Sequence, residues 1–198
     1  MKSLIKNNQQ ILVSIRCLVY NHEPYLRKCL DGFIMQKTNF AFEAIIHDDA
    51  SSDGSAEIIR EYAEKYPDII KPIYEIENQY SKKDCSLLRI MNEACTGKYI
   101  AMCEGDDYWT DPYKLQKQVD FLESHPDYVL CSHRYRKFYQ NTLSFDNSIL
   151  PRYFNKDFTF DLNYYILRED WVTQPLTCMY RASAFDYDYY ILNSATLL

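Results

Sequence analysis

The segment from residue 98 to residue 109 reads Lys98-Tyr99-Ile100-Ala101-Met102-Cys103-Glu104-Gly105-Asp106-Asp107-Tyr108-Trp109. It is an apolar run of strand length that ends in three carboxylates around one glycine. Like charges a few ångströms apart repel one another, so each acid resists ionisation unless a cation lies between them. Oxygen ligands of this kind suit Mg²⁺ or Mn²⁺, which are usually shared with substrate phosphates. The segment therefore predicts a buried strand whose end carries a metal or phosphate site.

A plainer explanation is that these acids begin the next helix or form a solvated turn. A helix is expected directly afterwards, because Asp111 is a good N-cap and Pro112 suits the first helical position. Asp111 already supplies that cap, however, which leaves Glu104, Asp106 and Asp107 without a role in the helix. We therefore interpret the acids as a metal or phosphate site, with a solvated turn as the alternative.

Apolar runs of strand length alternate with helical patterns along much of the chain. Strands are expected at Ile11–Val19, Phe42–Ile46, Ile69–Ile76, Tyr99–Cys103 and Tyr128–Cys131, with helices beginning near Pro24, Gly54, Leu87 and Asp111. Alternation at this spacing favours an α/β fold with a mostly parallel sheet and helices on both faces. A chain of 198 residues with 47% apolar content can bury one core, so one domain over residues 1–198 is expected.

Composition argues against several classes of protein. The net charge of −6 argues against a nucleic-acid-binding surface, and no apolar run approaches the ~20 residues of a membrane span. With four glycines and neither G-x-G-x-x-G nor G-x-x-x-x-G-K-[ST], the chain lacks a glycine-rich phosphate loop. Its seven cysteines are scattered and form no C-x-x-C pair, so most are expected to be reduced core residues. The cytoplasm is therefore the default location.

Polar side chains follow the expected strands at the point where each strand ends. In chain order they are Tyr20-Asn21, Asp48-Asp49, Glu77-Asn78 and the acids from Glu104 to Asp107. Ligands of open α/β sheets bind beyond the carboxyl ends of the strands. Four strand ends of this composition predict a nucleotide site that works through a metal.

These residues, in this order, resemble glycosyltransferase family 2, a group of inverting transferases with a GT-A fold. The matching pieces run from Val13 to Asn21, from Ile45 to Ser55, from Thr96 to Ile100 and from Glu104 to Trp109, with Glu23, Tyr25-Leu26, Lys114-Leu115 and Gln118 beside them. The resemblance covers roughly residues 11–130, where several unrelated motifs recur in register. It implies a nucleotide-sugar-binding half over about residues 11–130 and a partial acceptor-side half over about residues 131–198.

The resemblance implies a role for each matching position on the donor side. Asp49 should bind the ring N–H of uracil or an equivalent base, and Asp106 should lie near the donor ribose and the metal. Tyr20 and Asn21 should shape the nucleotide pocket. The sequence departs from the family at Val19, where relatives frequently have threonine.

The resemblance also implies a metal-assisted reaction. Asp107 should ligate Mn²⁺ or Mg²⁺ beside the diphosphate as the last acid of a D-x-D-type cluster, with Asp106 beside it. Glu104 stands where many relatives have aspartate, which keeps the charge on a longer arm. The acceptor hydroxyl would attack the anomeric carbon in a single displacement, with a carboxylate as base.

The base is the part of the pattern that the sequence does not supply clearly. In the family it is an acid that follows a strand resembling residues 176–181 and a short helix. Asp186 and Asp188 are the only acids in that region of this chain, and they come early in the expected alignment. We therefore leave the base unassigned, with these two as weak candidates, and expect the chain to be truncated at its C-terminus, to bind donor nucleotide and to transfer sugar poorly.

The function implied is transfer of a sugar from a nucleotide-diphosphate sugar, with UDP preferred, to a glycan or lipid-linked sugar acceptor. Surface polysaccharide or glycan synthesis at the inner face of a membrane, with peripheral association, would fit that chemistry. Nucleic acid is not an expected partner, and no oligomeric state is predicted. The alternative from another class is a non-catalytic nucleotide-sugar-binding module, that is, a truncated or decayed transferase.

Overall fold

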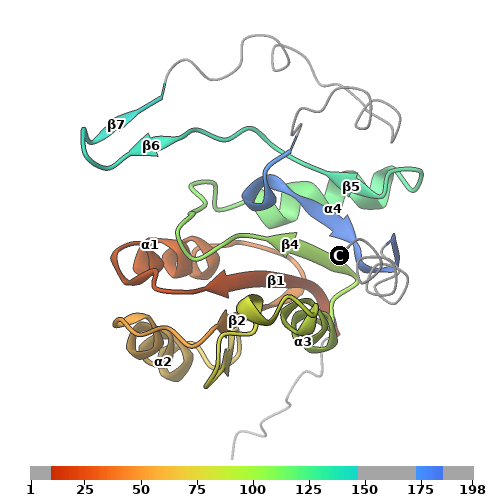
Figure 1. Ribbon diagram of the computed structural model, residues 1–198. Helices are drawn as coiled ribbons and strands as arrows, with labels where there is room; N and C mark the ends of the chain where they lie inside the picture. Colours follow the sequence, from red (N-terminus) through yellow and green to blue (C-terminus); the bar gives the residue numbers. More distant parts are fainter. Residues whose placement is uncertain (1–9, 147–172, 185–198) are drawn as a thin grey trace, which may run out of the picture.

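A six-stranded sheet forms the centre of the molecule, with the strand order β3-β2-β1-β4-β8-β5 (Figure 1). The computed structural model describes residues 10–146 and 173–184. The strands are β1 (Ile11–Val19), β2 (Ala41–Asp48), β3 (Ile70–Tyr74), β4 (Tyr99–Met102), β5 (Leu130–Cys131), β6 (Phe138–Tyr139), β7 (Ser144–Phe145) and β8 (Met179–Arg181). The α-helices are α1 (Glu23–Ile34), α2 (Ser55–Lys65), α3 (Ser86–Ala94) and α4 (Lys114–Ser124), and the 3₁₀ turns are η1 (Tyr80–Lys82), η2 (Pro175–Thr177) and η3 (Ala182–Ala184).

The sheet is mostly parallel, as the alternation of strands and helices predicts. β1 pairs in parallel with β2 on one side and with β4 on the other, and β2 pairs in parallel with β3. β8 is the exception, because it lies between β4 and β5 and is antiparallel to both. β6 and β7 form a separate two-stranded hairpin. The expected α/β fold is therefore confirmed, while the place of β8 is set by contacts between segments far apart in the chain.

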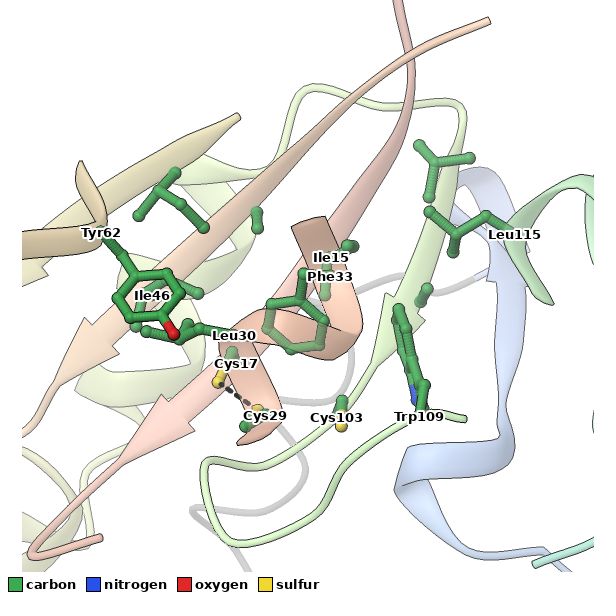
Figure 2. Close-up of a cluster of buried hydrophobic side chains, with 14 of the residues drawn as sticks. Ile15, Cys17, Cys29, Leu30, Phe33, Ile46, Tyr62, Cys103, Trp109 and Leu115 are labelled. Carbon is green, nitrogen blue, oxygen red and sulfur yellow. Dashed lines mark hydrogen bonds between the residues drawn. The ribbon is translucent and has the colours of Figure 1, made fainter. Parts of the chain in front are cut away.

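The main core lies between one face of the sheet and the helices α1, α2 and α4. Alternate residues of β1, including Ile15 and Cys17, pack there against Leu30 and Phe33 of α1 and against Leu115 of α4 (Figure 2). All five side chains are fully buried. Alternation of inward and outward side chains along β1 is what a strand covered by helices requires.

The opposite face of the sheet holds a buried polar network at the amino end of the strands. The Ser14 hydroxyl donates to Glu43 Oε1 at 2.7 Å, and the same carboxylate oxygen accepts from the Thr96 hydroxyl at 2.7 Å. Ser14 Oγ in turn accepts from the backbone N–H of Gly97 at 2.8 Å. The network joins the residues that follow α3 to β1 and β2. α3 therefore covers the face of the sheet opposite α1 and α2, and helices lie on both faces.

Gly97 is the tightest backbone position in this network. A Cβ on this residue would lie 2.5 Å from the Ser14 nitrogen, 2.8 Å from the Val13 carbonyl carbon and 3.0 Å from the Tyr99 carbonyl oxygen. All three are main-chain atoms of strands that cannot separate without breaking the sheet. Only glycine allows β4 to begin this close to β1.

The helix after the acids begins later than the sequence predicts. α4 starts at Lys114 with Tyr113 at the N-cap and no side-chain cap, so the expected cap at Asp111 with Pro112 at the first helical position is wrong. Asp111 instead closes a turn before the helix, because its Oδ1 accepts from the Tyr113 N–H at 2.9 Å. Its other oxygen pairs with Lys117 Nζ at 2.6 Å, which holds this carboxylate on the surface of α4.

The cysteines behave as core residues. All seven lie within the described ranges and none forms a disulfide, and four of them are buried: Cys17, Cys29, Cys103 and Cys178. The Sγ atoms of Cys17 and Cys29 lie 4.0 Å apart (Figure 2). Among residues 10–146 and 173–184, no helix is long and apolar enough to cross a bilayer.

Candidate functional site

The carboxyl ends of β1, β2 and β4 meet at one edge of the sheet. The backbone N–H of Asp49 donates to the Val19 carbonyl at 2.9 Å, and that of Gly105 donates to the Leu18 carbonyl at 2.9 Å. The end of β1 thus lies between the residue that follows β2 and the acidic segment that follows β4. The structure brings together at this edge the residues that the sequence predicts there, including exposed Tyr20.

Asn21 links the loop after β1 to the loop after β2. Its backbone has a φ of 57°, in the left-handed region that asparagine tolerates better than most residues. Its Oδ1 accepts from the Ser52 N–H at 2.8 Å, and its own N–H donates to Ser51 Oγ at 2.9 Å. Asn21 therefore uses its side-chain oxygen inside the protein, where it shapes the edge of the site.

A second set of bonds joins the beginnings of α1 and α2. The Glu23 N–H donates to Asp53 Oδ2 at 3.0 Å, while the Gly54 N–H donates to Glu23 Oε2 at 2.8 Å. The Ser55 N–H donates to Asp53 Oδ1 at 3.0 Å. These carboxylates satisfy N–H groups that the first turns of the two helices leave open. The reciprocal bonds hold the two loops that border the site as one unit.

Asp49 is buried, with 4% of its surface exposed, and both of its carboxylate oxygens accept backbone N–H bonds. Oδ1 accepts from Gln79 at 2.6 Å and Oδ2 from Tyr80 at 3.1 Å. Each oxygen retains a second lone pair that could accept from a ligand. Tyr20, in the loop after β1, is 50% exposed, and Tyr80, whose backbone N–H bonds Asp49, is 76% exposed. The arrangement offers a buried acceptor and two exposed tyrosines at the same edge.

The acidic segment carries a carboxylate that ionises with difficulty. Partial burial, followed by the nearby charges of Asp106 and Glu104, raises the pKa of Asp107 to about 6. Asp106 and Glu104 themselves are exposed. A Cβ on Gly105 would lie 2.7 Å from His22 Nδ1, so this segment sits directly against the start of α1. Burial disfavours the charged form of Asp107, and the like charges of Asp106 and Glu104 disfavour it further.

These residues fit a divalent cation that a substrate helps to hold. In the described part of the chain, no three histidine, cysteine or acidic side chains lie close enough together to hold an ion by themselves. Mg²⁺ typically takes one or two carboxylates and completes its shell with water and substrate phosphates. The electrostatic strain on Asp107 is what a bound cation would relieve. Asp107, with Asp106 or Glu104, could therefore hold such an ion only together with a phosphate ligand.

Trp109 fixes the far end of the acidic segment. The ring is buried and packs on Phe33 with centroids 4.9 Å apart (Figure 2). Its Nε1 donates to the Leu176 carbonyl at 2.9 Å. Lys114, a buried lysine, lies against the same ring. Lys114 is among the pieces that match the family, but the sequence assigned it no role, because its position before the apolar stripe of α4 does not reveal that distant segments cover it.

The two weak candidates for the base, Asp186 and Asp188, lie outside the described residues.

A family model described as "Glycosyl transferase family 2" matches residues 14–187. The chain belongs to this family. An uncharacterized protein of Mycobacterium tuberculosis is 42% identical to this family 2 chain over 152 residues, which cover 75% of the chain and 42% of that protein. EpsE of Bacillus subtilis, whose name describes a glycosyltransferase, is 38% identical over 116 residues, or 59% of the chain and 40% of that protein. The family 2 chain thus spans about two fifths of the length of these relatives.

Solved structures share the fold. S. aureus TarS 1-349, crystallised in complex with UDP, superposes with a TM-score of 0.66 at 19% sequence identity. The superposed region covers 90% of the family 2 chain and 49% of the TarS chain. The mannosyltransferase PcManGT from Pyrobaculum calidifontis, in complex with GDP-Man and Mn²⁺, superposes with a TM-score of 0.54 at 25% identity, over 65% of the family 2 chain and 37% of that chain. The GT-A-type fold implied by the resemblance is confirmed.

Proposed function

We propose that this chain is the donor-binding part of a metal-dependent glycosyltransferase. It would take a nucleotide-diphosphate sugar, with UDP as the preferred nucleotide, and transfer the sugar to an acceptor hydroxyl with inversion. The observation that carries the proposal is the partly buried Asp107, whose pKa is raised to about 6 in an acidic segment that lies beside the end of β1 and Asp49. This edge combines carboxylates for a cation, a buried hydrogen-bond acceptor and exposed tyrosines, and this combination suits a nucleoside diphosphate.

Each side chain at this edge has a distinct part in the proposal. Asp49 accepts from the base, Tyr20 provides a ring face, and Asn21 keeps the two loops joined. Asp106 lies toward the ribose and the metal. Asp107 would hold Mn²⁺ or Mg²⁺, with Glu104 and Asp106 adding negative charge; the ion would supply positive charge to the departing diphosphate.

The wider biological setting belongs to the same proposal. Residues 11–130 form the nucleotide-sugar-binding half, and residues 131–198 form part of the acceptor side. The acceptor would be a glycan or a lipid-linked sugar, and the work would take place in the cytoplasm at the inner face of a membrane, in surface polysaccharide or glycan synthesis. Support comes from the family and from relatives whose names describe glycosyltransferases.

Nucleotide binding should raise the thermal stability of the purified chain only when a divalent cation is present. A ligand that binds only the native state adds about 2.7 kcal/mol of stability at 100 times its Kd. Since UDP is the proposed nucleotide, we expect UDP with Mn²⁺ to raise the unfolding midpoint more than GDP or CDP. The measurement is thermal unfolding with each nucleotide, with Mn²⁺ or with EDTA. A shift without sugar transfer would favour a binding module; no shift with any nucleotide would defeat the proposal.

The affinity for UDP with Mn²⁺ should decrease as the pH falls. The pKa of Asp107 is raised to about 6, so the carboxylate is ionised at pH 7.5 and mostly protonated at pH 5. A ligand must lose its proton before it binds a metal, so protons and Mn²⁺ compete for it. We expect the UDP–Mn²⁺ affinity to drop by about tenfold between pH 7 and pH 5. Isothermal titration at several pH values tests this, and a flat profile would show that Asp107 is not a ligand.

A further inference from the structure

Lys114 is a buried lysine in the first turn of α4. Only 4% of its surface is exposed. Its Nζ donates to Gln118 Oε1 at 2.6 Å and lies 3.9 Å from the centroid of the Trp109 ring. This geometry places an amine against the face of an indole, the aromatic side chain that attracts cations most strongly.

The surroundings of this amine do not compensate its charge. Burial lowers the pKa of Lys114 to about 7, and the nearby groups that oppose this effect are the thiols of Cys103, Cys131 and Cys178. Among the described residues no carboxylate pairs with it, and Asp111 pairs with Lys117 instead. A buried amine without a carboxylate usually destabilises a protein relative to an apolar side chain of the same length. Packing alone therefore does not explain a lysine here.

The partners of the amine connect the acidic segment to two other parts of the molecule. Trp109 ends that segment and donates to the Leu176 carbonyl at 2.9 Å. Gln118 lies on α4, and its Nε2 donates to the Thr177 carbonyl at 2.9 Å. Lys114 therefore lies where the acidic segment, α4 and η2 meet, with Trp109 on one side and Gln118 on the other.

We propose that Lys114 is a positioning residue whose amine holds the Trp109 ring in place and so fixes Asp107, two residues earlier in the chain, for the cation and the diphosphate. The anchoring of the acidic segment stands on the contacts alone. Its consequence for donor binding rests on the proposed function.

The test compares Lys114→Met with Lys117→Met, which removes an exposed lysine from the same helix. Hydrogen exchange, followed by mass spectrometry, measures the protection of residues 103–110 without any ligand. In Lys114→Met we expect exchange of these amides to quicken by about tenfold, with an unfolding midpoint equal to or above that of the parent. We expect the Kd for UDP with Mn²⁺ to rise by about tenfold, and Lys117→Met to match the parent in all three measurements.

Lys114→Arg provides the matched rescue, because it keeps a cation against the indole. It should retain the slow exchange of residues 103–110 that Lys114→Met loses. Unchanged exchange in Lys114→Met, or faster exchange across the whole domain with a lower midpoint, would overturn the inference. If the parent chain binds no nucleotide but the exchange pattern is as expected, the proposed function fails and the positioning role stands.

Discussion

Asp107→Asn is expected to abolish Mn²⁺-dependent nucleotide binding and to leave the ligand-free protein more stable at neutral pH. An amide of the same shape cannot supply the charge that a divalent cation requires, so we expect the UDP–Mn²⁺ affinity to fall at least about 100-fold, or ~2.8 kcal/mol. Isothermal titration with UDP and Mn²⁺ measures this loss. A variant that binds as well as the parent would exclude Asp107 as a ligand.

The gain in stability follows from the raised pKa. Consider a carboxyl group whose pKa is higher in the folded state than in the unfolded state. It contributes stability when the pH is below its unfolded-state pKa, and this contribution is lost as the pH rises through its folded-state pKa. For Asp107 the folded-state pKa is about 6. At pH 7 the ionised Asp107 therefore destabilises the ligand-free protein. After a discount for its partial exposure, asparagine should restore about 1 kcal/mol. Asp127→Asn, at an exposed position in the turn after α4, is the control and should change neither binding nor stability.

Gly97→Ala is expected to lower stability by about 3 kcal/mol or more, because the added methyl group overlaps main-chain atoms. The new Cβ would lie 2.5 Å from the Ser14 nitrogen, and relief would require β1 and β4 to separate. For a domain of this size, such a loss corresponds to a fall of about 6–12 °C in the unfolding midpoint. Urea-induced unfolding measures the free energy directly.

Gly54→Ala is the matched control for this prediction. Its Cβ would also be close to a neighbour, at 2.7 Å from Glu23 Oε1, but that atom is the end of a flexible side chain that can move away. We expect a loss of at most about 1 kcal/mol, chiefly from a weakened bond between the Glu23 carboxylate and the Gly54 N–H. Equal losses in the two variants would show that the sheet can adjust around residue 97.

The site could be predicted from the sequence in outline because its parts are local. Three acids directly after an apolar run must lie at the end of a strand, wherever that strand is placed. Parallel pairing of β1 with β2 and β4 then brings Asp49 and the acidic segment to the same edge. The residue types and their positions after the strands were therefore sufficient to predict that Asp49 and the acidic segment lie at one edge of the sheet.

The immediate surroundings of single polar side chains could not be predicted in the same way. Asn21 turns its oxygen to Ser52, and Asp49 accepts N–H bonds from Gln79 and Tyr80. Asp111, a good N-cap by residue type, instead closes a turn before α4 begins. Each of these outcomes depends on where a neighbouring backbone amide comes to lie, which residue type does not reveal.

The sequence by itself determined the alternation of strands and helices, the mostly parallel sheet and the acidic edge, because periodicity and strand ends are properties of short stretches. Only the tertiary structure decided that β8 enters between β4 and β5 and that Lys114 is buried against Trp109. The place of the strand depends on a segment more than 40 residues away, since Arg181 pairs with Tyr99. The two neighbours of the lysine are also held by a distant segment, since Trp109 donates to Leu176 and Gln118 to Thr177. Burial of a charge is a property of what covers it, and the covering segment is chosen by the whole fold.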